Sequence, residues 1–277
     1  MTAVMPTRPV RREGFGSFLV DCATMTQRNL LIIVRVPQLL VGATLQPLMF
    51  VLLFSYVFGG ALGGDPYRQF LMGGIFTQTV VFSAGFTAIG LATDSREGIV
   101  ERFHSLPMSR LAIVLGRTVT DALVSVVSIG VMIAAGLLVG WRINGSAGDA
   151  LGAIALLVFF GFAMSWMGAV VGLISATAES AQSVLMIIVF PLTFISSAFI
   201  PSATLPGPLR FFAQWNPVTS VARATREAFG NPTAPSTLIS EPVTWASSNP
   251  ALYSVIASIV LLAIFVPLTL KVSDART

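Results

Sequence analysis

The strongest constraint on the fold of this chain is a set of six long stretches that carry no charged residue. Each stretch contains an apolar run of roughly 20 residues, the length of helix needed to cross a hydrocarbon layer about 30 Å thick. Lipid offers the backbone no hydrogen-bond partner, so a spanning segment must pair its own amides as a helix. The runs are continuous and lack the alternation expected of a barrel strand. We therefore expect six transmembrane helices, near residues 38–60, 69–92, 119–140, 151–176, 182–200 and 251–270.

The composition excludes a water-soluble protein. Apolar residues make up 55% of the 277 positions and charged residues only 10%, against about 25% charged residues in ordinary soluble domains. Such a chain has too few polar side chains to cover a soluble core, and it is too hydrophobic to be disordered. The single cysteine, Cys22, cannot form an internal disulfide or a cysteine-based zinc site. The sequence therefore predicts an all-α integral membrane protein.

The distribution of Lys and Arg predicts the orientation in the membrane. With six spans, both ends of the chain lie on one side, and that side carries eleven of the 16 basic residues. The positive-inside rule then places both termini in the cytoplasm. This asymmetry accounts for most of the basic character of the chain, so we expect no nucleic acid partner. Asp21 interrupts the apolar run after the basic N-terminus, which is unlike a cleavable signal peptide. We expect a multi-pass protein of the plasma membrane.

The segment before the first span is predicted to lie on the membrane surface. Residues 1–14 are interpreted as a flexible N-terminus, and residues 15–36 are too charged to span the membrane. Apolar side chains recur at helical spacing at Phe15, Phe18, Leu19, Cys22 and Met25. This pattern predicts an amphipathic interfacial helix that Pro37 ends, and the six-span region then covers residues 37–277. The alternative is a flexible lead-in with accidental periodicity.

The loop over residues 93–111 is the most informative segment between the spans. Asp94 is a suitable helix N-cap, and Glu97 follows three residues later, as in a capping box. The apolar face of the predicted helix consists of Ile99, Val100, Phe103 and Leu106, and Pro107 ends it. A short amphipathic helix in a cytoplasmic loop has no core of its own. Its apolar face therefore packs either in a groove on a partner or on the membrane surface or the neighbouring spans, and the pattern favours neither alternative.

The longest loop, residues 201–250, lies on the outer side before the last span. Its first half is aromatic and amphipathic, which predicts one or two short helices at the outer interface or dipping into it, where Trp215 would be well placed. A backbone that dips into the membrane must be buried in protein. The second half, residues 231–250, is rich in Pro, Ser, Thr and Asn and is predicted to be an exposed loop.

The residues needed for several kinds of chemistry are missing. No ionisable side chain lies in the middle of a predicted span, which argues against a proton- or sodium-coupled carrier. Lys271 is the only lysine and lacks the glycine-rich context of an ATP-binding P-loop, and the only histidine, His104, cannot form the paired motif of a metalloprotease. We therefore expect no catalytic, cofactor-binding or metal-ligating residue. Any ATP-driven work needs another polypeptide.

Three charged residues near the ends of spans are predicted to be interface anchors. Arg117 and Asp121 are four residues apart, which allows an ion pair on one helix face. Glu179 lies alone in the turn between the fourth and fifth predicted spans, where contact with a partner is also reasonable.

Two motifs give the chain a family resemblance. The stretch from Asp94 to Arg110, D-S-R-E-G-I-V-E-R-F-H-S-L-P-M-S-R, precedes Gly116, Arg117 and Asp121. It resembles the signature loop of type-2 ABC exporter permeases, in their daunorubicin-resistance (DrrB-like) branch. The second motif consists of Trp215, Asn216 and Pro217, followed by Arg226 and Gly230. The order of segments is similar to that family over nearly the whole chain.

The resemblance implies two permease subunits, identical or paralogous, and two cytoplasmic ATP-binding subunits that hold ATP and Mg²⁺. The loop helix would be a coupling helix seated in the ATPase, and residues 15–36 would be a connecting helix beside it. The implied coupling residues are Asp94, Arg96, Glu97, Gly98, Ile99, Val100, Glu101, Arg102, Phe103, Leu106 and Pro107. Residues 206–230, with the second motif, would be a re-entrant helix pair. The implied cargo is an amphipathic drug, antibiotic or lipid that moves outward.

Three alternatives stay open at this stage. The same architecture exports polysaccharides or glycolipids, although twenty Phe against three Tyr and four Trp favour an apolar path. A membrane scaffold that regulates an ATPase and an ion-coupled carrier are the other two. The sequence does not predict which side chains line the substrate path.

Overall fold

The computed structural model describes residues 15–57, 64–99, 109–234 and 241–275, and every regular element within these ranges is a helix. In chain order the elements are α1 (Phe15–Arg35), α2 (Pro37–Leu52), the π-helical turn η1 (Leu53–Val57), α3 (Asp65–Phe82), α4 (Ala84–Arg96), α6 (Arg110–Leu138), α7 (Ala147–Ile174), α8 (Ala178–Phe194), the 3₁₀ turn η2 (Ser202–Thr204), α9 (Gly207–Trp215), α10 (Pro217–Ala228), α11 (Trp245–Ser248) and α12 (Pro250–Ala275). The predicted all-α class is confirmed.

Five helical segments within the described ranges are long and apolar enough to cross a membrane. They are Leu40–Val57, Asp65–Arg96, Leu111–Leu138, Ala147–Ile174 and Pro250–Ser273. Each overlaps one of the predicted spans. The remaining predicted span, the fifth (182–200), contains only the shorter helix α8, which has 17 residues and ends at Phe194. The described residues therefore support five full-length spans rather than the six expected.

The end of α8 is completed from another part of the chain. Backbone hydrogen bonding continues past Pro191, which lies inside the helix, because the amide of Ile195 donates to the Pro191 carbonyl oxygen at 2.8 Å. The side-chain amide of Asn216 then donates to the carbonyl oxygens of Leu192 and Ile195 at 2.6 and 2.8 Å. These carbonyls lie at a helix end, where they would otherwise lack partners. A residue more than 20 positions later thus completes the end of α8.

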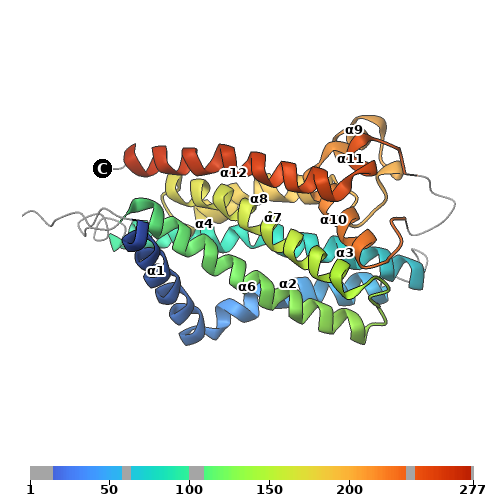
Figure 1. Cartoon of the computed structure of the whole chain (residues 1–277), viewed down its shortest axis with the longest axis horizontal. Coiled ribbons are helices and arrows are strands. Elements are labelled where there is room, and N and C mark those ends of the chain that lie inside the picture. The colour runs from blue at the N-terminus through green and yellow to red at the C-terminus, as the bar shows by residue number, and fades with distance from the viewer. Residues whose placement is uncertain (1–14, 58–63, 100–108, 235–240, 276–277) are drawn as a thin grey trace, which may run out of the picture.

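The second spanning segment forms the centre of the bundle. It consists of α3 and α4, separated only at Ser83, where the chain bends. Most of α3 is buried, and α6, α7 and α8 pack around the two helices, while α12 packs against α7 and α2 packs against α6 and α3 (Figure 1). Much of α12 stays exposed within this single chain, because only 11% of its most apolar 18-residue stretch is buried. An exposed apolar helix of this kind suits contact with lipid.

Two glycines let α7 approach α4 closely. A Cβ atom at Gly168 would lie 2.2 Å from the carbonyl oxygen of Ala84, and one at Gly172 would lie 2.5 Å from that of Ala88. No real Cβ atom tolerates such contacts. The glycine spacing therefore allows backbone-to-backbone packing of the kind common in membrane helices.

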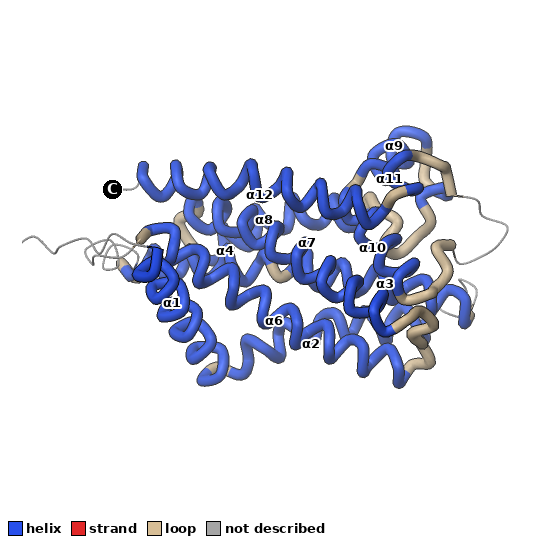
Figure 2. The backbone as a smooth tube through the Cα atoms, viewed as in Figure 1, coloured by secondary structure: helices blue, strands red, loops and turns tan. Residues whose placement is uncertain are grey.

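The bundle has two differently built ends. The beginning of α1 and the end of α12 lie at one end, which we call the α1 end (Figure 1). There α1 is inclined to the long helices and packs against the first half of α6. The short helices α9, α10 and α11 lie at the opposite end, here called the α10 end, together with most of the described loops (Figure 2). The first half of the long loop, where one or two short helices are predicted, contains α9 and α10.

Candidate functional site

At the α1 end, Asp94 joins two helices. The guanidinium of Arg28 on α1 donates from Nη1 and Nη2 to the two carboxylate oxygens of Asp94 on α4, both at 3.1 Å. The pair is largely buried, and a bidentate arginine–carboxylate pair fixes orientation as well as distance. The predicted N-cap role of Asp94 is wrong, because this residue lies within α4, two residues before the helix ends at Arg96. Its acceptor oxygens bind a guanidinium instead of backbone amides.

The chain turns sharply just after α4. The amide of Glu97 donates to Thr93 and that of Gly98 donates to Ser95, which closes the helix. Gly98 has φ +67°, a left-handed conformation that glycine adopts at little cost. Arg96 and Glu97 are exposed here, and Ile99 follows half-buried. The other predicted coupling residues, Val100, Glu101, Arg102, Phe103, Leu106 and Pro107, lie outside the described residues.

Glu179 lies near the same turn. It is in the first turn of α8, after the cap Thr177. Its own amide, the hydroxyl of Thr177 and the positive charge of Arg96 lower the pKa of its carboxyl. The charge of Arg96 acts on Glu179 because α8 packs against α4. The structure thus places Glu179 near Arg96, one of the predicted coupling residues.

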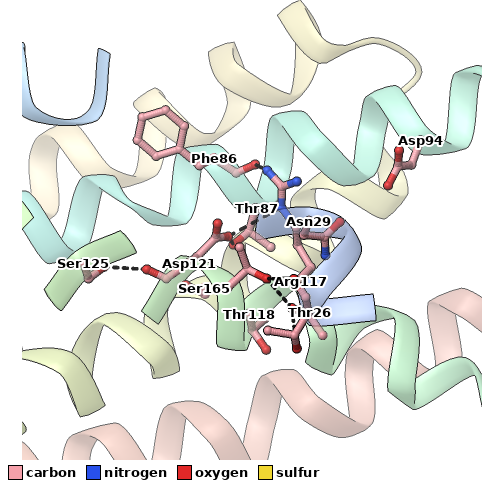
Figure 3. Close-up of polar contacts among 12 residues, drawn as sticks. Thr26, Asn29, Phe86, Thr87, Asp94, Arg117, Thr118, Asp121, Ser125 and Ser165 are labelled. Atoms are coloured by element: carbon pink, nitrogen blue, oxygen red, sulfur yellow. Dashed lines mark hydrogen bonds and ion pairs between the residues drawn. The ribbon is translucent and has the colours of Figure 1, made fainter. Parts of the chain in front are cut away.

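The predicted ion pair between Arg117 and Asp121 is present, deeper in the bundle (Figure 3). Arg117 Nε lies 3.7 Å from Asp121 Oδ2, and Arg117 Nη2 donates to the carbonyl oxygen of Phe86 at 2.7 Å. Asp121 also accepts a hydrogen bond from Thr87 and is only 3% exposed. A Cβ at Gly90 would collide with the guanidinium. The pair therefore joins α6 to α4 inside the protein, rather than facing a membrane surface.

Sequence reasoning did not single out Arg28 or Thr87. Arg28 is one of several basic residues in an amphipathic helix, and no spacing rule pairs it with a residue 66 positions away. Thr87 is a small polar residue in an apolar span, which usually bonds within its own helix. The available signal was the position of Asp121 inside the predicted span 119–140, where a carboxylate needs hydrogen-bond partners within the protein.

At the α10 end, Arg226 is fully buried. Its Nε donates to the carbonyl oxygen of Phe70 on α3 at 2.6 Å, and its Nη2 donates to Ser197 and Ala198 at 2.9 and 2.8 Å. The guanidinium carbon lies 3.6 Å from the ring centroid of Phe70. Burial lowers the pKa of Arg226 to about 9, so the side chain is charged at neutral pH. It fastens α10 to α3 and to the segment after α8.

The other residues of the second motif shape the same end. Asn216 Oδ1 accepts from the amide of Val218, so it caps α10, and Pro217 is the first residue of that helix. The carbonyl oxygen of Trp215 accepts from the hydroxyl of Tyr253 on α12 at 2.6 Å. Gly230 has φ +67°, and its turn lies against the loop between α6 and α7. The five motif residues therefore belong to one structural unit, which runs from the end of α9 through α10 to the turn at Gly230.

Within the described ranges, no three His, Cys, Asp or Glu side chains gather as metal ligands. The fold and the two polar ends define a multi-pass membrane protein whose helices are tied together at both ends by arginines. The family model described as "ABC-2 type transporter" matches residues 20–229. The chain belongs to the ABC-2 type transporter family, the membrane-spanning permeases of ABC transporters.

Three individual relatives are also transport permeases by their names. The chain is 33% identical over 222 residues to the daunorubicin resistance ABC transporter permease protein DrrB1 of Streptomyces coeruleorubidus, covering 79% of this chain and 77% of the relative. It is 25% identical over 232 residues to the probable doxorubicin resistance ABC transporter permease protein DrrC of Mycobacterium tuberculosis, covering 82% and 84%. It is also 24% identical over 225 residues to the putative transport permease ycf38 of Pyropia yezoensis, covering 78% and 76%.

Proposed function

We propose that this chain is the membrane-spanning subunit of an ATP-driven exporter that moves amphipathic drugs, antibiotics or lipids out of the cytoplasm or the inner leaflet. The similarity to a daunorubicin resistance permease over four-fifths of the chain carries this proposal. The middle parts of the predicted spans carry no ionisable side chain, which supports a cargo that is apolar or amphipathic rather than ionic. A separate cytoplasmic subunit binds ATP and Mg²⁺ and hydrolyses the ATP, since this sequence has no P-loop.

In this proposal the α1 end is cytoplasmic, and α8 is the fifth of six spans in the plasma membrane. A 17-residue helix is about 25 Å long. The non-helical residues directly after Phe194 then complete the crossing of the hydrocarbon layer. The polar groups of such a non-helical stretch are tolerated at membrane depth when protein covers them, as Asn216 covers the end of α8. α1 serves as the connecting helix, and α9 with α10 serves as the re-entrant pair. A second permease subunit, identical or paralogous, completes the pathway.

The coupling segment begins where α4 ends. ATP binding closes the partner subunits and moves residues 93–107, and the bundle switches between two discrete arrangements. The bidentate pair between Arg28 and Asp94 supports this proposal, because it ties α1 to α4 immediately before the turn at Gly98. A displacement of the turn is then passed to both helices.

Co-purification tests the proposal. The native chain, carrying an affinity tag, is expressed with any ATP-binding subunit encoded beside it, in parallel with Phe103→Asp. We expect the native chain to retain the subunit and the variant to lose it, because a charge disrupts an apolar contact. Phe211→Asp is the matched control, since Phe211 is 63% exposed on α9 at the opposite end. Equal retention by native chain and Phe103→Asp, or no retention at all, contradicts the coupling role.

Efflux separates this proposal from an ion-coupled carrier. Cells expressing both subunits are loaded with daunorubicin, and its release is followed with ATP depleted or with the proton gradient collapsed. We expect release to stop with ATP depletion alone. Release that depends only on the proton gradient rules out the ATP-driven mechanism.

A further inference from the structure

A groove of about 500 Å³ lies at the α10 end, between α7, α10 and α12. Gly152 and Ala155 line it from α7, Ala224 and Ala228 line it from α10, and Val255 lines it from α12. These side chains are small, so they leave the space between the three helices unfilled. A Cβ atom at Gly152 would meet nothing within 4 Å. The volume of the groove is in the range of ligand-binding sites, about 300–1,000 Å³.

The groove faces the surroundings of the bundle rather than its interior. Its two walls, α7 and α12, are both long and apolar enough to span a membrane. Gly152, Ala155 and Val255 are exposed along it. In a membrane these positions face lipid, and an unfilled space would forfeit the dispersion contacts of its lining. A hydrocarbon chain is therefore the chemistry that fits the groove.

The groove is about one leaflet long. Along α7 its lining runs from Gly148 to Phe159, which is a rise of about 17 Å in an α-helix. Half of a hydrocarbon layer about 30 Å thick is about 15 Å. A groove that begins at the membrane surface thus ends near the middle of the bilayer. This length matches a single lipid chain, whereas a spanning helix of another subunit would continue through both leaflets.

One charged side chain stands at the rim of the groove. Asp149 is exposed in the first turn of α7, and its Oδ2 accepts a hydrogen bond from the hydroxyl of Ser146 at 2.7 Å. A carboxylate has further acceptor sites, and the other described residues of the lining are uncharged. Arg223 and Glu227 on α10 pair with each other at 3.0 Å and do not line the groove. A headgroup at this rim therefore meets a negative charge, which attracts an ammonium group and repels an anionic headgroup.

We propose that the groove holds one acyl chain of an ammonium-bearing phospholipid, a resident lipid of the outer leaflet that fills the space between α7, α10 and α12. Its ammonium group lies beside Asp149, and its chain lies along Gly152 and Ala155. The lipid stays bound during transport and is not cargo. Only the assignment to the outer leaflet rests on the proposed function, which places the α1 end in the cytoplasm.

Native mass spectrometry tests the site. The full chain, with any subunits that accompany it, is titrated in detergent with phosphatidylethanolamine or phosphatidylglycerol, and the bound lipids are counted. The native chain should bind one phosphatidylethanolamine more tightly than phosphatidylglycerol. Gly152→Leu should weaken that binding about tenfold, because the new side chain displaces lipid carbons that pack in the groove. Asp149→Asn should lower the ratio of the two affinities about threefold, since it removes an exposed charge and keeps an acceptor for Ser146.

Gly130→Leu is the matched control. Gly130 is exposed on α6, within another spanning segment, and a Cβ atom there also meets nothing within 4 Å, but it does not line the groove. This variant should bind phosphatidylethanolamine as tightly as the native chain. Equal affinities in Gly152→Leu and Gly130→Leu overturn the site, and a native affinity ratio in Asp149→Asn overturns the headgroup class. If Gly152→Leu separates two copies of the chain without changing lipid binding, the groove is a subunit contact and the proposal is wrong.

Two further measurements keep the outcome decisive. Size-exclusion chromatography checks folding, and if Gly152→Leu is misfolded, Ala155→Leu replaces it under the same criterion. Release of the lipid when ATP and Mg²⁺ are added contradicts a resident lipid and indicates cargo. The co-purification of Phe103→Asp tests the export machinery independently of this groove. Normal lipid binding without retention of an ATP-binding subunit refutes the proposed function alone, whereas normal retention without the lipid preference refutes the groove alone.

Discussion

Replacing Arg226 with Met tests whether one buried guanidinium holds α10 on the bundle. The side chain donates three hydrogen bonds to backbone carbonyls and stacks on Phe70. Hydrogen bonds to charged groups contribute about 1.5–3 kcal/mol each, and a buried cation–π contact contributes about 2 kcal/mol. The cost of burying the charge offsets much of this sum. Removing the guanidinium leaves up to three buried carbonyl oxygens without this partner, at about 1–3 kcal/mol each, so we expect a net loss of about 3–5 kcal/mol.

Thermal unfolding of the detergent-solubilised chain measures this loss. A destabilisation of this size should lower Tm by about 10 °C. Arg226→Lys should keep most of the defect, because a single ammonium cannot reproduce the planar arrangement of donors or the stacking. Arg223→Met is the matched control on the same helix. Arg223 makes a partly exposed ion pair with Glu227 at 3.0 Å, and such pairs contribute about 0–1 kcal/mol.

Two results would contradict this prediction. If Arg226→Met unfolds within about 2 °C of Arg223→Met, which corresponds to less than about 1 kcal/mol, the three hydrogen bonds do not stabilise the fold. A native Tm for Arg226→Lys would show that charge alone is sufficient.

Three further substitutions follow from the geometry. Asp94→Asn should leave membrane insertion normal but lower drug release per ATP hydrolysed, because Arg28 loses its bidentate partner; a native ratio of release to ATPase rate contradicts this. Gly168→Ala should destabilise the chain by about 1–3 kcal/mol through overpacking, read as a lower Tm, whereas Gly152→Ala should be neutral because nothing lies within 4 Å of its Cβ position. Asn216→Ala should cost about 1–3 kcal/mol by leaving buried carbonyls unpaired; a native Tm would exclude the cap.

Much of the fold followed from the positions of charges. Long uncharged stretches predict helices because lipid leaves the backbone no other solution, and five of the six predicted spans are full-length helices in the described residues. The end of α8 was not predictable in this way, because it depends on Asn216, which lies in another part of the chain. Hydropathy continues past Phe194, whereas the helix does not.

The polar sites were predicted only in part, for a similar reason. The four-residue spacing of Arg117 and Asp121 predicted their ion pair, since such neighbours share a helix face. It did not predict burial, which depends on the packing of α4 over the pair. Asp94 matched a capping pattern, but its partner Arg28 lies on a different helix. The predictions for Val100 to Pro107 remain predictions, because these residues lie outside the described part of the chain.

The double role of Asn216 has a mechanical consequence. Its amide nitrogen holds the last carbonyls of α8, and its amide oxygen holds the first amide of α10. The two helices therefore cannot tilt independently without breaking these hydrogen bonds. Arg226 extends the connection to the backbone of α3. Any tilt that begins at Glu179, at the far end of α8, reaches the α10 end of the bundle as a movement of three helices together.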